Sequence, residues 1–328
     1  MHRLKTSVPE PPELSIIIVN WNTRDLLRDC LSSVYAETEA TSNEVLVVDN
    51  ASSDGSAEMV KREFPQVRLI ENGENLGFAR ANNQAIRQSR GSYILLLNPD
   101  TVVLSGALDQ MVAFMRAHPD VDASGPMVLT PDGSLQRRSV RDAWYTFDFC
   151  ARFLLADCLP PHVARLIVSK LSKSKTYRPR PQRVRRVRMV TGACMMMTRE
   201  AVDKVGLFDE QYFLYAEEVD WFYRLGQLGG KTYFIPEARI LHHIAQSVKQ
   251  TDTPLKHSYR SRYLFMKKHH TKVQAYFFRI MVAIDSFVAM CAFLLLRAVV
   301  KGDKREEMRW KLRRHWRAFL WAVGRDKG

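Results

Sequence analysis

Leu95-Leu96-Leu97-Asn98-Pro99-Asp100-Thr101 is the stretch from which the fold of this chain can be predicted. Apolar residues run without a break from Tyr93 to Leu97, which is typical of a strand covered on both faces. Pro99 then removes a backbone donor and ends the strand. Asp100 is therefore expected on a loop at the carboxyl end of a central strand, where open α/β sheets bind their ligands. A plain turn is the alternative, because Asn, Pro and Asp are common turn residues.

Strand and helix signals alternate on either side of this stretch. Before it, strands are expected at 14–19, 44–48 and 67–70, and helices around Leu26–Val34, at 56–64 and at 78–89. After it, strand signals return at 189–197 and 232–235, with a helix at 218–228 between them. This alternation predicts a mostly parallel, doubly wound sheet. Right-handed crossovers would bring the strand ends after Val19, Val48 and Leu97 to one edge.

The chain is expected to contain one catalytic domain and an appendage. The domain covers 14–250, after an extension at 1–13, and a basic helical tail follows at 251–328. Within the domain, the region 137–188 is irregular and basic, and no acidic residue occurs between Cys158 and Arg199. We interpret this region as an insertion or an acceptor-side lobe.

The composition indicates a globular protein of a reducing compartment. A hydrophobic content of 46% is enough to build a core. The five cysteines lie far apart without a CxxC pair, so neither a zinc site nor a disulfide framework is expected. The segment 1–13 has no apolar run, so no cleaved signal peptide is expected and the catalytic part should stay in the cytoplasm. The net charge of +14 attracts polyanions such as nucleic acid, anionic lipid headgroups or diphosphates, although a solvated surface explains any single Lys or Arg.

The tail contains an apolar segment, Ile280–Leu296, interrupted by Asp285 and Ser286. As a helix it would be about 26 Å long, short of the roughly 30 Å hydrocarbon core of a bilayer. Asp285 would cost about 2.5 to 3.5 kcal/mol in a membrane span. We therefore favour a helix in the membrane interface, with the anionic membrane surface as partner of 273–328, over a spanning helix or a soluble packing or dimer helix.

Three motifs fall at the edge where the sheet is expected to bind its ligand. Asp49 ends a strand and could accept from a base imide or a ribose hydroxyl, with turn capping as the alternative. Gly77 opens a helix whose N-terminus could bind an anion, with a simple capped helix as the alternative. At Asp100 a divalent ion with hard oxygen ligands would neutralise a diphosphate leaving group, whereas Asn98 offers only a neutral carbonyl.

Two later groups of residues are candidates for catalysis or metal binding. Glu217, Glu218 and Asp220 open a helix, and like charges held close together raise one another's pKa, which suits a general base. Ordinary first-turn acids favoured by the helix dipole are the alternative. His242 and His243 follow a strand, and alternation would point one of them inward for a metal or phosphate role. Packing or solvent exposure of both is the alternative.

Seven ordered motifs carry a resemblance to a known family. They are Ser15–Asn22, Val47–Ser56, Asn75–Asn83, Leu95–Thr101, Thr191–Ala193, Gly206–Glu210 and Glu217–Asp220. Together they resemble the family 2 glycosyltransferases, in particular the bacterial rhamnosyltransferase-like branch, over roughly 14–246. The resemblance implies the GT-A nucleotide-sugar fold, an α/β fold whose mostly parallel central sheet is flanked by helices, here with a C-terminal helical tail. It also implies inversion of the anomeric centre in a single displacement.

The resemblance further implies which residues bind the nucleotide-sugar donor. Asn20 and Asp49 would lie near the nucleoside. The donor pocket would be shaped by Asn75, Gly77 and Asn82.

A metal ion, Mg²⁺ or Mn²⁺, is the cofactor that the resemblance implies. Asp100 would hold it, and His243 would be an additional metal or phosphate ligand. Asn98 stands where many relatives carry the first Asp of a DxD motif, so this position departs from the wider family pattern.

The implied reaction moves a sugar, with rhamnose suggested by the branch, from a nucleotide-diphosphate donor to a hydroxyl of a glycan or lipid-linked acceptor. Glu218 stands where the family usually has an aspartate as base, and Glu217 or Asp220 could share the role. The setting would be cell-envelope polysaccharide synthesis on the inner face of the cell membrane, with no nucleic acid as partner. The alternatives are a nucleotidyl- or phosphosugar transferase and a non-enzymatic basic protein that binds nucleic acid or membranes.

Overall fold

The structure is a computed structural model that describes residues 10–136, 140–141, 183–243, 254–299 and 303–325. The chain forms two compact units. The first contains 1–141, 182–208 and 221–246, and the second contains 142–181, 209–220 and 247–328. Most of the predicted basic lobe at 137–188 lies outside the described residues.

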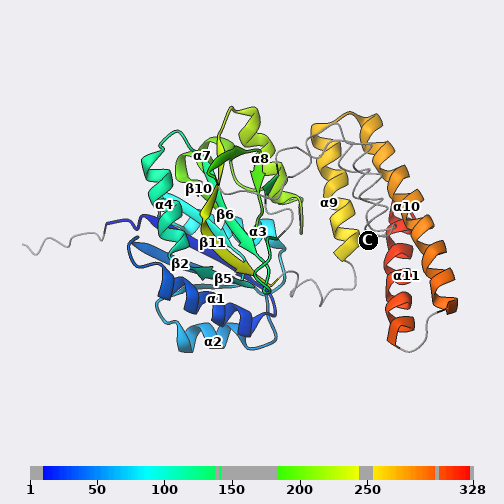
Figure 1. The fold of residues 1–328 in the computed structure, drawn as a ribbon, viewed down its shortest axis with the longest axis horizontal. Coiled ribbons are helices and arrows are strands. Elements are labelled where there is room, and N and C mark those ends of the chain that lie inside the picture. The colour runs from blue at the N-terminus through cyan, green and yellow to red at the C-terminus, as the bar shows by residue number, and fades with distance from the viewer. Residues whose placement is uncertain (1–9, 137–139, 142–182, 244–253, 300–302, 326–328) are drawn as a thin grey trace, which may run out of the picture. The chain divides into compact units, whose positions relative to one another are not determined.

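A nine-stranded sheet forms the centre of the first unit (Figure 1). Its strands run in the order β3-β2-β1-β4-β10-β6-β11-β5, with β8 beside β11. Their bounds are β1 Leu14–Asn20, β2 Asn43–Asp49, β3 Arg68–Glu71, β4 Tyr93–Leu97, β5 Thr101–Leu104, β6 Ala123–Leu129, β8 Arg185–Val187, β10 Cys194–Thr198 and β11 Thr232–His242. A separate small sheet pairs β7 Val140–Arg141 with β9 Met189–Val190.

The four strands nearest the N-terminus, β3-β2-β1-β4, are mutually parallel, as the alternation predicted. β10 runs antiparallel to both of its neighbours, β4 and β6. β11 is parallel to β6 but antiparallel to β5 and β8. The antiparallel pairings were not predicted, and the strand expected at 232–235 continues past a register shift to His242.

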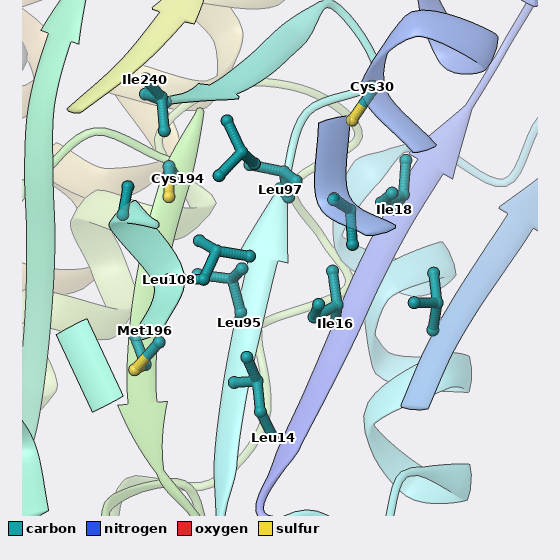
Figure 2. Close-up of a cluster of buried hydrophobic side chains, with 14 of the residues drawn as sticks. Leu14, Ile16, Ile18, Cys30, Leu95, Leu97, Leu108, Cys194, Met196 and Ile240 are labelled. Atoms are coloured by element: carbon teal, nitrogen blue, oxygen red, sulfur yellow. The ribbon is translucent and has the colours of Figure 1, made fainter. Parts of the chain in front are cut away.

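Helices flank this sheet and supply its core. They are α1 Arg24–Glu37, α2 Ser56–Glu63, α3 Phe78–Gln88, α4 Ala107–Ala117, α7 Arg199–Val205 and the later part of α8 Glu217–Gln227. Figure 2 shows one core layer, in which Ile16 of β1 and Leu95 of β4 lie among side chains from helices and neighbouring strands. Leu96, on the opposite face of β4, is also fully buried, so the central strand is covered on both faces as predicted.

The second unit contains three helices among its described residues, α9 Pro254–His269, α10 Lys272–Val299 and α11 Asp303–Ala322. α10 and α11 pack antiparallel, since Arg279 donates to the carbonyl oxygens of Trp321 and Ala322 while Phe293 lies against His315. The expected apolar helix at 280–296 is thus the middle of a helix that is 28 residues long.

Candidate active site

Polar residues collect at the carboxyl edge of the parallel strands. Asn20 and Asp49 are paired across β1 and β2, and the end of β4 is in register with β1, so the turn after Leu97 lies at the same edge. β11 also ends there, because His242 is the partner of Thr101 at the start of β5. The sheet therefore brings three groups of predicted site residues to one edge. They are Asn20 with Asp49, the turn that contains Asp100, and His242.

The Asn20 and Asp49 side chains form one buried hydrogen-bonded pair. Asn20 Nδ2 donates to Asp49 Oδ1 at 2.9 Å, and the backbone N–H of Ser52 donates to Asp49 Oδ2, also at 2.9 Å. Ser52 Oγ in turn accepts from the backbone N–H of Asn22 at 2.9 Å. Asn22 and Ser52 were not predicted as site residues, although both lie in the quoted motifs. These hydrogen bonds join the loop after β1 to the loop after β2.

Gly77 precedes α3 in a conformation that favours glycine, with φ of 81°. Asn75 Oδ1 accepts from its backbone N–H at 3.0 Å, which orders the approach to the helix. Asn82, predicted to shape the donor pocket, is 1% exposed and its amide donates back to the carbonyl of Phe78 at 2.8 Å. Its observed hydrogen bond therefore lies within α3 rather than toward an open space.

Asn83, the neighbour of Asn82, connects α3 to the loop after α7, a contact that the sequence did not reveal. Its Nδ2 donates to the carbonyl of Phe208 at 2.9 Å, and its Oδ1 accepts from the backbone N–H of Phe208 at 3.0 Å. These two hydrogen bonds hold Phe208 of the Gly206–Glu210 motif against α3. Asn83 and Phe208 are far apart in the sequence, so their contact becomes visible only in the structure.

The turn between β4 and β5 is closed by the backbone of Asn98. Its N–H donates to the carbonyl of Ala193 at 2.9 Å, and its carbonyl accepts from Thr101 Oγ1 at 2.7 Å. Cys30 lies beside this turn, and burial raises the pKa of its thiol to about 12, so the thiol stays neutral. The turn thus holds Asp100 at the sheet edge with 5% of its surface exposed.

His242 presents its ring to Asp100. Its Nε2 lies 3.1 Å from Asp100 Oδ1, and its Nδ1 lies 2.9 Å from Gln136 Oε1. The contact with Gln136 fixes the ring so that Nε2 is directed at the carboxylate of Asp100. His243, the residue favoured from the sequence, donates its backbone N–H to the carbonyl of Asp100 at 2.9 Å. The ring that lies beside Asp100 is that of His242, the neighbour of the predicted histidine.

The pair formed by Asp100 and His242 fits a divalent cation. A carboxylate oxygen and an imidazole nitrogen are ligands that such ions accept. Two neighbouring ligands on an octahedral ion with bonds of about 2.1 Å lie about 3 Å apart, which matches the separation of Nε2 and Oδ1. Within the ranges that the structure describes, no group of three or more His, Cys, Asp or Glu side chains could hold a metal. The remaining ligands would have to come from substrate and water.

The three predicted acids at the start of α8 belong to the second unit and have different surroundings. Asp220 is fully buried, and its Oδ1 lies 2.6 Å from Lys268 Nζ and 2.7 Å from His269 Nε2. Glu217 is 4% exposed, and its Oε2 has no hydrogen-bond partner among the described residues. Burial, and secondly the charge of Glu218, raise the pKa of Glu217 well above its ordinary value. Glu218 itself is partly exposed.

Solved structures define the class of fold. A mannosyltransferase from Pyrobaculum calidifontis, in complex with GDP-Man and Mn²⁺, aligns with a TM-score of 0.53 at 15% identity, over 96% of this chain and 87% of that one. GalNAc-T7, solved with UDP, GalNAc and Mn²⁺, aligns with a TM-score of 0.51 at 20% identity, over 71% of this chain and 43% of that one. The α/β architecture is therefore the GT-A fold of glycosyltransferases, and the predicted fold class is confirmed.

The sequence profile described as glycosyl transferase family 2 matches residues 15–206, and the chain belongs to this family. It is 28% identical over 270 residues to the N-acetylglucosaminyl-diphospho-decaprenol L-rhamnosyltransferase of Mycobacterium tuberculosis, covering 79% of this chain and 85% of that relative. An O-antigen biosynthesis protein of Myxococcus xanthus is 26% identical over 77% of this chain but only 19% of its own length. The predicted family and its rhamnosyltransferase-like branch are confirmed.

Proposed function

We propose that this glycosyltransferase moves a sugar, with inversion of its anomeric centre, from a nucleotide-diphosphate donor to a hydroxyl of a lipid-linked acceptor in envelope polysaccharide synthesis. The observation that carries the proposal is the collection of Asn20, Asp49, Asp100 and His242 at the carboxyl edge of the parallel strands. The mycobacterial rhamnosyltransferase, whose name specifies a diphospho-decaprenol acceptor, supports rhamnose as the sugar and a polyprenyl diphosphate as the lipid carrier.

Donor binding is assigned to the loops at this edge. The carboxylate of Asp49 and the amide of Asn20, already aligned by their own hydrogen bond, would receive the nucleoside. The start of α3 at Gly77, ordered by Asn75, would face the diphosphate, because the free N–H groups of a helix N-terminus favour anions. Asn82 would support this pocket through the structure of α3 itself.

We assign the metal, Mg²⁺ or Mn²⁺, to Asp100 and His242, with His243 holding the backbone of Asp100 in place. When bound, the ion would supply positive charge to neutralise the departing nucleoside diphosphate. Asn98 contributes through the backbone that closes the turn, so Asp100 carries the charge that attracts the ion.

Glu218 is the acid best suited to remove the proton from the acceptor hydroxyl. A general base must be ionised and accessible. Asp220 is fully buried and already paired with Lys268, while the raised pKa of Glu217 favours its protonated, neutral form. Glu218 is the remaining acid of the cluster and is partly exposed.

Substitution of two adjacent glutamates tests this assignment. Glu218→Gln should lower kcat by about 10² to 10⁴ while still binding donor, because general base catalysis contributes about that factor. Glu217→Gln, the matched control one residue away, should retain most activity. The assay measures nucleoside diphosphate release from a nucleotide-diphosphate rhamnose with a polyprenyl-diphospho-N-acetylglucosamine acceptor, and NMR of the product reports the anomeric configuration. Equal activities of Glu218→Gln and the parent would contradict the base assignment, and a retained configuration would contradict inversion.

We further propose that the protein is peripheral on the cytoplasmic face of the membrane through 273–328. α10 carries a row of large apolar side chains that are at least 40% exposed: Val273, Tyr276, Phe277, Ile280, Ile284, Phe287, Val288, Leu294 and Leu295. The row extends over about 33 Å of helix. Within the described part of the chain, Lys272–Leu295 is the one helix long and apolar enough to cross a membrane, with a mean hydropathy of 2.0. Large exposed apolar patches mark interaction surfaces, and this one has the length of a membrane-binding helix.

Flotation with anionic liposomes tests the membrane proposal. Replacing Ile284, Phe287 and Val288 together by Ser should abolish flotation of the full chain. Leu228→Ser is the control, since Leu228 is similarly exposed, at 47%, but lies outside α10. Undiminished flotation of the triple variant would contradict the role of α10.

A further inference from the structure

The segment Asp209–Asp220, which contains the proposed base Glu218, is contacted along its length by a single helix. At its start, Asp209 Oδ2 lies 2.7 Å from Lys268 Nζ. In its middle, the carbonyl of Leu214 accepts from Ser261 Oγ at 2.7 Å. At its end, Asp220 Oδ1 lies 2.6 Å from the same Lys268 Nζ. Lys268 and Ser261 both belong to α9, so one helix binds the segment at three points.

Asp220 lies at the buried centre of this cluster. Asp220 has none of its side chain exposed, and Lys268 has 27% and His269 13%. Tyr212 donates its hydroxyl to Asp220 at 3.3 Å, and its ring lies 5.4 Å from Lys268 Nζ. The Oδ1 atom of Asp220 is thus already engaged by Lys268 and His269. Asp220 is therefore not placed to remove a proton from an acceptor hydroxyl, and its role is to hold the segment against α9.

The backbone just before the glutamates needs such anchors. Tyr215 and Ala216 both have positive φ values, 70° and 68°, which L-residues adopt at a cost and keep only when the surrounding structure holds them. The N–H of Asp220 then donates to the carbonyl of Ala216 at 2.9 Å and closes the first turn of α8. The direction in which Glu217 and Glu218 leave the backbone thus depends on both ends of the segment being fixed.

We propose that α9 is a template for the acid-bearing segment, and that Asp220, Lys268 and Ser261 are positioning residues that set the orientation of Glu218. The inference rests on the proposed role of Glu218 as base. α9 precedes the proposed membrane-binding segment 273–328, so the two parts of the second unit have separate tasks. Asp220 is accordingly removed from the set of candidate bases.

Two kinds of measurement on the full chain test the template. Lys268→Met removes both ion pairs and keeps the apolar stem, and it should lower kcat by about 10²-fold, the loss that follows from a misplacement of about 1 Å, with little change in donor KM. Lys268→Arg should restore much of the rate because it restores the charge. Lys267→Met, next to it on an exposed position, is the matched control and should behave as the parent. Ser261→Ala, a milder change, should lower kcat by a smaller factor.

Amide hydrogen exchange reads the template without any substrate. Lys268→Met should speed exchange in 209–220 and Lys267→Met should not. In a Glu218→Gln background, Lys268→Met should cost little further rate, because its effect passes through Glu218. Parent-like kcat in Lys268→Met, or unchanged exchange in 209–220, would overturn the template. A parent protein that transfers no sugar while the exchange responds as expected would contradict the proposed function and leave the template standing.

Discussion

Glu217 provides a prediction in which stability and pH are linked through one side chain. Its carboxyl is buried, Oε2 has no hydrogen-bond partner among the described residues, and burial together with the charge of Glu218 raises its pKa. In the unfolded chain a glutamate titrates near pH 4.3. Folding therefore binds this proton more tightly, and the stabilising effect of the neutral form is complete below the unfolded value.

The sign of the effect follows from proton binding. As pH rises from about 4.3 toward the raised pKa, the unfolded state releases a proton that the folded state retains, so the free energy of unfolding falls. The loss is about 1.4 kcal/mol for each unit of pKa elevation, and it is complete above the folded value. Glu217→Gln cannot ionise, so its stability lacks this decline. The unpaired buried polar atom, worth about 1 to 3 kcal/mol, remains in both proteins and shifts the two curves without changing their slopes.

Urea denaturation at pH 4 to 8 measures the difference. The stability of Glu217→Gln relative to the parent should increase with pH across that range. Glu58→Gln, at an exposed position of α2, is the control and should follow the parent at every pH. Glu218→Gln should flatten part of the slope, because the charge of Glu218 is the second cause of the shift. Parallel stability curves for Glu217→Gln and the parent would refute the reasoning.

Three further predictions concern the first unit. Gly91→Ala should destabilise the folded protein by about 1 to 3 kcal/mol, because the added methyl group would lie 2.5 Å from a backbone nitrogen of β1. Gly73→Ala is the control, since a methyl group there meets nothing within 4 Å, and the urea midpoints of the two variants should differ accordingly. Asn83→Ala should destabilise the folded protein by about 1 to 3 kcal/mol, since the buried N–H and carbonyl of Phe208 would lose this partner. Equal urea midpoints for the variant and the parent would argue against this. Gln136→Ala should weaken Mn²⁺ binding with nucleoside diphosphate by about 10- to 100-fold in calorimetry, because it releases the ring of His242, and unchanged affinity would contradict the metal assignment.

The central strand and its flanks were predictable because local signals agree there. The apolar run Tyr93–Leu97 matches β4 at both ends, since a strand buried on both faces needs no polar position and Pro99 cannot continue it. The direction of β10 was not predictable in the same way. The composition of an apolar strand does not indicate whether it pairs in the parallel or the antiparallel direction. The antiparallel pairing of β10 with β4 and β6 depends on how the chain enters the sheet before β10.

The histidine beside Asp100 shows a signal that was present but not followed far enough. After the register shift in β11, Ala238 and Ile240 are buried while Glu237 and Arg239 are exposed, and this alternation places His242 inward. The strand expected from the sequence ended at Ile235, so this parity was not carried to its end. For the acids the limit was different. Spacing alone gives Glu217 and Asp220 equal claims, and Asp220 is distinguished only by Lys268 and His269, which come from another helix.

The tail illustrates how a side chain's environment changes a membrane argument. Asp285 counted against a spanning helix when it was placed in hydrocarbon, but it is 7% exposed and accepts from the Tyr259 hydroxyl at 3.4 Å, so that objection loses its basis. A stronger one replaces it, because α11 packs along α10 and exposes a row of arginines: Arg305, Arg309, Arg313 and Arg317. Each would cost about 2.5 to 3.5 kcal/mol at the centre of a bilayer. At the membrane surface proposed above, the same row would meet anionic headgroups while the apolar row of α10 would enter the interface. This proposal therefore has the paired helices lying on the membrane rather than crossing it.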